Sequence, residues 1–182
     1  MFLRLSSMDA GSLAQAELLD AYDYVWERLL RRLDGLSDEE YLWEPVAGCL
    51  TVRATPSGVV PDPGVWPDVQ PAPFTTVAWR LCHIADNFTE DRIAPLLGSS
   101  TPPRSPTLWP MTAGAAVDYV EAGYLSWRAN LASAEPNSLW RTLDDDSTPY
   151  RGRSLFRFLL QYLEEFAHHA AEVALLRDLY RS

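Results

Sequence analysis

Residues 154–180 read SLFRFLLQYLEEFAHHAAEVALLRDLY, and this stretch decides the fold. Eight of its residues, most of them apolar, follow one another at steps of three and four, which places them on one face of a helix roughly 40 Å long. The stripe consists of Leu155, Phe158, Tyr162, Glu165, His169, Glu172, Leu176 and Leu179. Polar side chains interrupt this otherwise apolar face in its middle, so the helix is expected to supply both core residues and functional residues.

Three other stretches show the same helical period. The first begins at the N-cap Ser12 and ends at Gly35, the second runs from residue 75 or 76 to about residue 97, and the third begins at the N-cap Thr112. Their expected core residues are Leu18, Tyr22, Val25, Leu29 and Leu33, then Val77, Leu81, Ile84 and Phe88, then Val117, Val120, Tyr124, Trp127 and Leu131. Four long helices predict an all-α protein, a four-helix bundle with long proline-rich connections.

The connections are marked by proline. Residues 50–74 contain six prolines and residues 98–111 contain four, so neither segment can continue a helix, and both are predicted to be loops. Trp66 and Trp109 could anchor these loops over a site or simply pack on the outside of the bundle. Before the first loop, Ser37 and Glu40 predict a capping box that starts a short helix, which Pro45 stops.

The composition limits the classes of protein to which this chain can belong. The 182 residues are 47% apolar, which predicts one domain over residues 1–182 with a loose N-terminal arm at residues 1–11. A formal charge of −10 argues against nucleic-acid binding. No apolar stretch is long enough to cross a membrane, and no signal peptide is recognised. Two cysteines without a C-x-x-C spacing favour a reducing, cytoplasmic location.

A candidate metal site follows from three side chains. Glu165 and His169 lie four residues apart on the expected core face, where an acidic group needs a cation, a proton or a polar network. His83, at the edge of the second helix's apolar face, could supply a third ligand. Two imidazoles and one carboxylate suit zinc, nickel or ferrous iron and leave coordination positions open. The alternatives are an ordinary Glu–His ion pair and a partly buried His83, and His168, about 100° around the helix, is expected to support or pack.

Two helical strings resemble the DinB-like metalloprotein superfamily: TVAWRLCHIADNF at residues 76–88 and EFAHHAAEVALLRDLY at residues 165–180, together with LWEP at residues 42–45. Its members are four-helix bundles that include thiol-dependent transferases and mycothiol-dependent maleylpyruvate isomerase. The resemblance implies His83, Glu165 and His169 as metal ligands. Glu165 stands where many relatives carry His, although isomerase-type members carry Glu. The segment Ala170-Ala171-Glu172 replaces the commoner Arg-Gly-Gln.

The resemblance therefore implies a divalent-metal-dependent enzyme. We expect a thiol-dependent S-transferase or isomerase, of the mycothiol type, that acts on a small electrophile with zinc or nickel, or alternatively iron, and with a low-molecular-weight thiol as cosubstrate. Metal-dependent hydrolysis and a non-catalytic, stress-related metal-binding bundle are the alternatives. Cys82 as a nucleophile lacks a base at suitable spacing. The expected partners are a small-molecule substrate and a second copy of the chain, with neither nucleic acid nor membrane.

Overall fold

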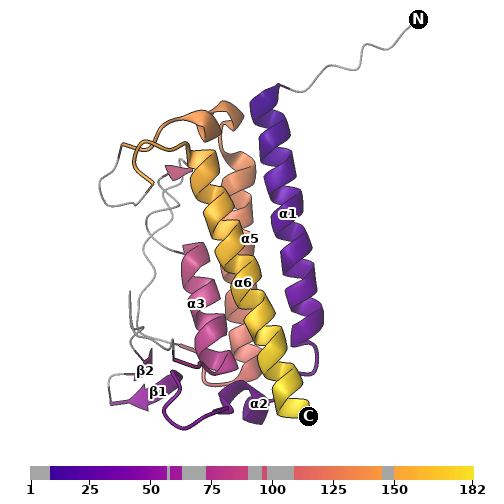
Figure 1. The fold of residues 1–182 in the computed structure, drawn as a ribbon, viewed down its shortest axis with the longest axis vertical. Helices are drawn as coiled ribbons and strands as arrows, with labels where there is room; N and C mark the ends of the chain where they lie inside the picture. The colour runs from indigo at the N-terminus through magenta and orange to yellow at the C-terminus, as the bar shows by residue number, and fades with distance from the viewer. Residues whose placement is uncertain (1–8, 57, 63–72, 90–95, 98–108, 145–149) are drawn as a thin grey trace, which may run out of the picture.

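The computed structural model describes residues 9–56, 58–62, 73–89, 96–97, 109–144 and 150–182. The elements in these ranges are α1 (Ala10–Leu33), α2 (Asp38–Leu42), β1 (Val52–Thr55), β2 (Gly58–Pro61), α3 (Val77–Thr89), α5 (Ala113–Ser133), the 3-10 helix η1 (Pro136–Trp140) and α6 (Leu155–Arg181). The predicted all-α helical bundle is confirmed (Figure 1). No helix within the described ranges is long and apolar enough to span a membrane.

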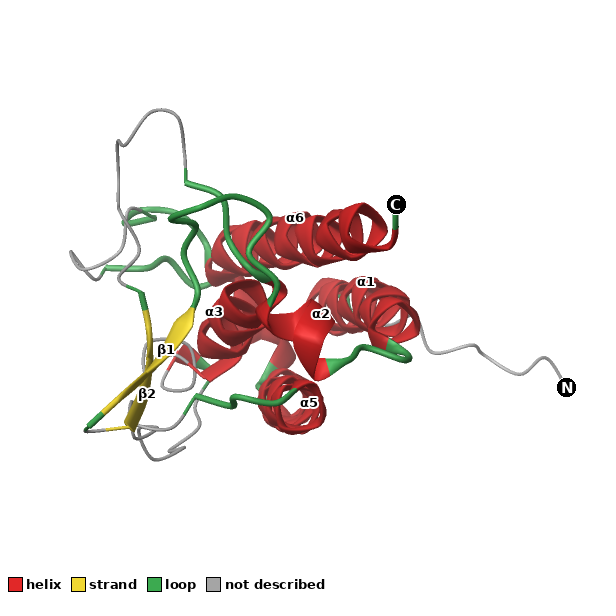
Figure 2. Cartoon of the chain, turned by 90° about the horizontal axis from the view of Figure 1, so that it is seen from below, coloured by secondary structure: helices red, strands yellow, loops and turns green. Residues whose placement is uncertain are grey.

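The four long helices form a ring. Helix α6 contacts α1 and α3, and α5 contacts the same two helices, so α1 and α3 occupy opposite corners, as the view along the bundle shows (Figure 2). Helices α1 and α6 run in one direction, whereas α3 and α5 run in the other (Figure 1). The first turns of α3 therefore lie beside the second half of α6, which is where the polar residues of the α6 stripe occur.

Helix ends follow local capping chemistry. Asp9 caps α1 by accepting hydrogen bonds from the backbone N–H groups of Gly11 and Ser12 at 3.0 and 3.1 Å. The helix thus begins at Ala10 and not after Ser12, so the last two residues of the predicted arm are helical, while residues 1–8 lie outside the described chain. Gly35, with φ +66°, ends the turn after α1 as expected.

The core of the bundle is rich in aromatic side chains. Tyr22 packs on Trp127 with ring centroids 4.0 Å apart, and Phe88 meets Phe166 at 4.9 Å. The Tyr22 hydroxyl donates to the Leu159 carbonyl at 2.8 Å, which satisfies the one polar atom of this ring. Most expected core residues are buried, namely Leu18, Tyr22, Leu29, Leu33, Val77, Leu81, Ile84, Phe88, Val120, Tyr124, Trp127 and Leu131. In α1, Trp26 takes the buried position expected for Val25, and in α6 the predicted core residue Leu179 is exposed.

The segment predicted as the first proline-rich loop contains a β-hairpin. Strands β1 and β2 pair antiparallel, with Val52 opposite Pro61 and Thr55 opposite Gly58. Its base is tied to the start of α3, because Leu50 donates to the Phe74 carbonyl at 2.8 Å and its own carbonyl accepts from the N–H of Thr76 at 2.9 Å. The structure thus differs from the predicted loop, while residues 63–72, including Trp66, lie outside the described chain.

The second predicted helix is described only in its first half. Helix α3 begins after Thr76, whose hydroxyl accepts from the Trp79 N–H at 3.1 Å, and it is described as far as Thr89. Residues 90–95, where the prediction continued the helix, lie outside the described ranges, as do residues 98–108 of the second predicted loop. Trp109, at the end of that loop, is buried against Tyr119 with centroids 5.8 Å apart.

A buried ion pair joins the C-terminal half of α6 to α2. Arg177 donates from Nε and Nη2 to the two carboxylate oxygens of Glu40 at 2.7 and 3.0 Å, and both side chains are fully or almost fully buried. Arg177 also donates to the Arg32 and Asp34 carbonyls at the end of α1. The predicted capping box is therefore half right: Ser37 caps α2, but the carboxylate of Glu40 is taken by Arg177.

We expect Arg177→Met to lower the free energy of unfolding by about 3–5 kcal/mol, because it leaves the Glu40 carboxylate buried without its cation. The matched control is Arg181→Met, which removes a side chain that is 51% exposed and lies 3.5 Å from the same carboxylate. That change should cost less than about 1 kcal/mol. Urea unfolding of both variants measures the difference, and equal losses would contradict a special role of the buried pair.

A lower pH should reduce the difference in unfolding free energy between wild type and Arg177→Met. Burial alone would raise the pKa of Glu40, but the hydrogen bonds and charge of Arg177 hold that pKa below its ordinary value of 4.5. A lowered folded-state pKa means that the stabilisation is fully present above pH 4.5 and is lost as the pH falls through the folded value. In Arg177→Met the effect of burial dominates, so the pKa of Glu40 is raised and the variant takes up a proton at a higher pH than the wild type. The gap in unfolding free energy between wild type and Arg177→Met should therefore begin to narrow above pH 4.5 and continue to narrow as the pH falls through the wild-type value.

Candidate metal centre

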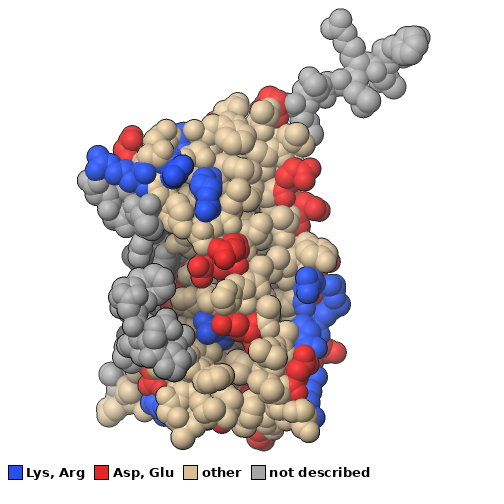
Figure 3. Space-filling view, in the orientation of Figure 1, with Lys and Arg blue, Asp and Glu red and all other residues tan. Residues whose placement is uncertain are grey.

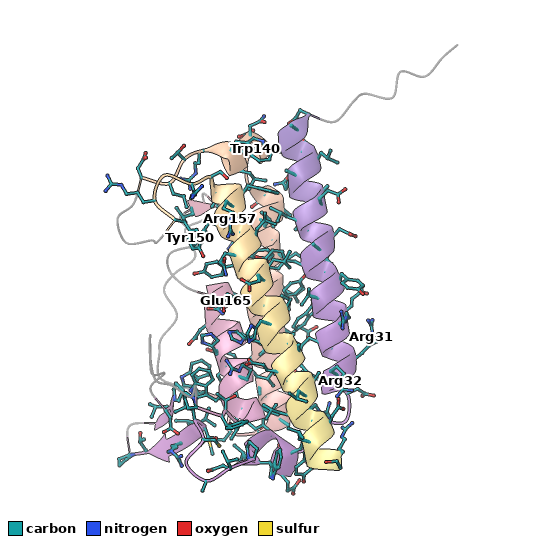
Figure 4. The ribbon with its side chains drawn as sticks, viewed as in Figure 1. Arg31, Arg32, Trp140, Tyr150, Arg157 and Glu165 are labelled. Atoms are coloured by element: carbon teal, nitrogen blue, oxygen red, sulfur yellow. The ribbon has the colours of Figure 1, made fainter. Side chains whose placement is uncertain are left out.

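The antiparallel packing of α3 on α6 places His83 beside His169, which also contacts Glu165. Glu165 and His169 come from α6, and Oε2 of Glu165 lies 3.2 Å from Nε2 of His169. His83 comes from α3, and its ring meets the His169 ring edge to face, with centroids 4.7 Å apart. Glu165 lies on the side of α6 that faces α3 (Figure 4). Its side chain is 46% exposed, so this part of the stripe opens to solvent and is not core.

Each ring nitrogen of His169 lies close to the carboxylate of a neighbouring glutamate. Its Nδ1 lies 2.8 Å from Oε2 of Glu172, and its Nε2 faces Glu165. A neutral imidazole carries one N–H and can donate to only one of these groups. The shorter contact with Glu172 assigns the proton to Nδ1, because an unprotonated nitrogen there would turn its lone pair towards an anionic oxygen. The lone pair of Nε2 then points towards Glu165, and this pair needs a proton or a metal cation between its atoms.

Arg80 holds Glu172 in this position. The Arg80 Nε atom lies 2.9 Å from Oε2 of Glu172. One terminal Arg80 nitrogen lies 3.1 Å from Nδ1 of His169, but with the proton on Nδ1 these two atoms are both donors, so this contact is not a hydrogen bond. Burial tends to raise the pKa of Glu172, but the hydrogen bond from His169 and the charge of Arg80 bring it below its ordinary value. Glu172 is thus an anion that fixes the tautomer of His169, an arrangement common around metal-ligating histidines.

His83 is held as a neutral imidazole. Its ring stacks on Trp79 at a centroid distance of 5.2 Å and an interplanar angle of 14°. Burial, together with the nearby His169 and Arg80, lowers the pKa of His83 to about 4. Because a metal binds the neutral form of histidine, this side chain is ready to act as a ligand at neutral pH.

The hairpin supports the α3 side of the site. The indole Nε1 of Trp79 donates to the Asp62 carbonyl at 2.9 Å, just after β2. The Asp62 carboxylate in turn accepts from the Thr51 N–H at 3.0 Å and from the Arg53 guanidinium at 2.9 Å. Trp79 also lies under the Arg80 guanidinium, 5.0 Å from the ring centroid. One indole therefore contacts both a candidate ligand and the residue that orients another.

The described group whose ligand atoms lie close together is not the expected set, although it also contains His169. Among the described residues, His168, His169 and Glu172 offer ligand atoms that lie within 4.8 Å of one another. Nε2 of His168 is 3.2 Å from Oε1 of Glu172, and the His168 side chain is largely exposed. In this set Glu172 would be a ligand, whereas in the set with His83 and Glu165 it orients His169. The support or packing role expected for His168 stays a prediction, because in this set His168 would itself be a ligand.

The distances fit a metal ion between Glu165 and His169. Two ligand atoms, each about 2.0–2.1 Å from a tetrahedral zinc ion, lie roughly 3.3 Å apart. The observed separation of Oε2 of Glu165 and Nε2 of His169 is 3.2 Å. The donor set of carboxylate oxygen and imidazole nitrogens also suits a divalent metal.

Two residues of the site, Trp79 and Arg80, were missed in the sequence. They precede His83 by four and three residues, the spacing that places all three on one side of a helix, and this was the available signal. The role of Glu172 followed only from the contact between α3 and α6. Cys82 is buried within 3.9 Å of the Tyr41 hydroxyl, an apolar setting that does not favour a reactive thiolate.

The chain matches the model of one known family over most of its length. Residues 21–173 match the family model described as the DinB superfamily, and this is well over half of the chain. The chain belongs to the DinB superfamily. No curated protein and no solved structure matches it. Membership supports a metal-binding protein, and the cluster of His168, His169 and Glu172 on α6 is a possible site for the ion.

We expect Glu172→Ala to change the tautomer of His169. Nitrogen NMR of the metal-free wild type should show a proton on Nδ1, and the variant should lose this preference because Nδ1 has lost its acceptor. Zinc affinity should fall by about 10–100-fold, the usual cost of removing a group that orients a histidine ligand.

The control for this variant is Glu164→Ala, which removes an exposed carboxylate of the same helix. It should leave both the tautomer and the zinc affinity unchanged. If Glu172→Ala also leaves both unchanged, Glu172 does not orient His169.

Proposed function

We propose that this chain binds one divalent metal ion through His83, Glu165 and His169, and that the ion serves a thiol-dependent transfer or isomerisation of a small electrophile. Zinc or nickel suits the donor set best, with iron as the alternative. The observation that carries the proposal is the environment of His169, whose two ring nitrogens both face carboxylates. A cation at Nε2 satisfies Glu165 and the histidine lone pair together.

The side chains around the site have different roles in this proposal. Glu165 and the two histidines supply three ligands, so coordination positions remain for a further molecule, as in catalytic metal sites. Glu172 and Arg80 orient His169, and Trp79 holds His83. A divalent cation in such a site lowers the pKa of a coordinated thiol, which is the chemistry that the proposed reaction needs.

The setting supports a thiol cosubstrate. Both cysteines of the chain, Cys49 and Cys82, are buried, so neither thiol is exposed to solvent. The nucleophile is therefore proposed to come from a small thiol of the mycothiol type, in a reducing cytoplasm. Water as the nucleophile would give a metal-dependent hydrolase with the same ligands, and a bundle without activity would be a stress-related metal-binding protein.

Metal analysis of purified protein tests the ligand set. Wild type loaded with zinc and then desalted should retain close to one ion per chain, and His83→Ala and His169→Ala should each lose it, because each removes one of three protein ligands. The matched control is His168→Ala, which removes the neighbouring imidazole and should retain the ion. Loss of zinc in His168→Ala, with retention in His83→Ala, would assign the ion to His168, His169 and Glu172 instead.

Cobalt substitution tests the thiol. The absorption bands of bound cobalt should change when a low-molecular-weight thiol is added, because a sulfur ligand enters an open coordination position. Methanol in place of the thiol is the control and should leave the bands unchanged. Cobalt bands without any response to the thiol would refute the thiol-dependent reaction while leaving metal binding intact.

A further inference from the structure

The carboxylate of Glu172 divides its contacts between its two oxygens. Oε2 lies 2.8 Å from Nδ1 of His169 and 2.9 Å from Nε of Arg80. Oε1 lies 3.2 Å from Nε2 of His168, which precedes Glu172 by four residues on α6. One oxygen therefore supports the candidate metal centre, whereas the other faces a histidine that the proposed function does not use.

The pair of His168 and Glu172 is open to solvent. The side chain of His168 is 59% exposed and that of Glu172 is 34% exposed. Figure 3 looks onto α6 and shows acidic groups at the surface along the middle of the bundle, within a largely uncharged area. A cation from solvent can therefore reach this pair without any movement of the helices.

The distance between the two atoms fits a metal ion. Two ligand atoms of one tetrahedral zinc ion lie roughly 3.3 Å apart, and Nε2 of His168 lies 3.2 Å from Oε1 of Glu172. A spacing of four residues is also the one at which two side chains of a helix bind zinc together. With a proton between the same atoms the contact is an ordinary exposed pair of one helix, which contributes little to stability. A divalent ion can displace that proton at little cost.

His169 does not belong to this outer pair. Its ligand atom lies within 4.8 Å of those of His168 and Glu172, but its Nδ1 carries the proton that it donates to Glu172, and its Nε2 faces Glu165. The cluster on α6 therefore divides between two ions. We propose that Nε2 of His168 and Oε1 of Glu172 bind a second divalent ion, the outer ion, whose other coordination positions are filled by water.

The outer ion is bound more weakly than the inner ion, which is the one proposed for His83, Glu165 and His169. The outer ion has two protein ligands instead of three, and the charge of Arg80 beside Glu172 repels it. Loss of a group that only orients a ligand weakens metal binding by about 10–100-fold, so loss of a whole ligand should weaken it by more than about 100-fold. Protein that is loaded with one equivalent of zinc, or desalted after loading, therefore holds only the inner ion.

The two ions are coupled through Glu172. A cation on Oε1 withdraws charge from Oε2, which accepts the Nδ1 proton of His169, and this makes Nε2 of His169 a weaker ligand. Binding of either ion therefore weakens binding of the other, because such a coupling is reciprocal. Free zinc that fills the outer site thus loosens the inner ion and regulates the metal centre negatively. The coupling rests on the ligand set of the proposed function, whereas the outer site does not.

A calorimetric titration of the metal-free protein with zinc tests the outer site. Wild type should show one tight step and one weaker step. His168→Ala should keep the tight step at unchanged affinity and lose the weaker one, whereas His83→Ala should lose the tight step and keep the weaker one. The matched control is Glu164→Ala, which removes an exposed carboxylate of the same helix and should keep both steps.

The titration separates failure of the outer site from failure of the proposed function. A wild type that binds a single zinc ion even in large excess, a weaker step that survives His168→Ala, or a tight step that His168→Ala removes would each overturn the outer site. A weaker step that depends on His168, without any tight step in wild type, would support the outer site and refute the ligand set of the inner ion.

Isotope exchange tests the coupling. Protein that holds one equivalent of radioactive zinc is placed in rising concentrations of unlabelled zinc, and release of the label is timed. In wild type the release should become about 5-fold faster or more as the outer site fills, and should then level off. In His168→Ala it should stay constant. Release that is unchanged in wild type, or that accelerates equally in His168→Ala, would overturn the regulation by the outer ion.

Discussion

The contact of Arg80 with Glu172 is the interaction on which the site depends. It joins the first turns of α3 to the second half of α6, with Arg80 Nε 2.9 Å from Oε2 of Glu172. The contact thereby fixes the position of one antiparallel helix along the other. At that level His83 meets His169, and the carboxylate of Glu172 directs the ring of His169 towards Glu165. One ion pair thus serves both the packing of two helices and the orientation of a candidate ligand. In a partly buried setting such a pair restricts geometry more than it adds stability.

Other contacts of the fold help to keep α3 at this position along α6. At the far end of α6, the buried pair of Arg177 and Glu40 holds α2 and the end of α1. On the side of α3, the Asp62 carbonyl after β2 accepts a hydrogen bond from Trp79, which holds the indole on which His83 stacks. The aromatic core packs the four helices against one another. A metal centre of this type needs such rigid support, since its ligands come from two helices.

Much of this was predictable from sequence because the signals are local. Helical period and side-chain caps located the long helices, and the i, i+4 spacing paired Glu165 with His169 correctly. Two of the errors occurred where a distant partner overrides a local preference. Glu40 satisfies a capping motif, but it pairs with Arg177, 137 residues away. The hairpin has strands of only four residues beside prolines, and it depends on contacts with the start of α3. The role of Arg80 required the relative position of two helices, which no single helix encodes.

The location of the bound ion is the most direct test of the central assignment. Crystals of the zinc-loaded protein, measured at wavelengths on both sides of the zinc absorption edge, reveal the ion by its anomalous signal. We expect one peak between α3 and α6, with Nε2 of His169, Glu165 and His83 as ligands and with Glu172 on Nδ1 of His169. A peak bound by His168 and Glu172, or a site without zinc in protein that retains its fold, would contradict the assignment.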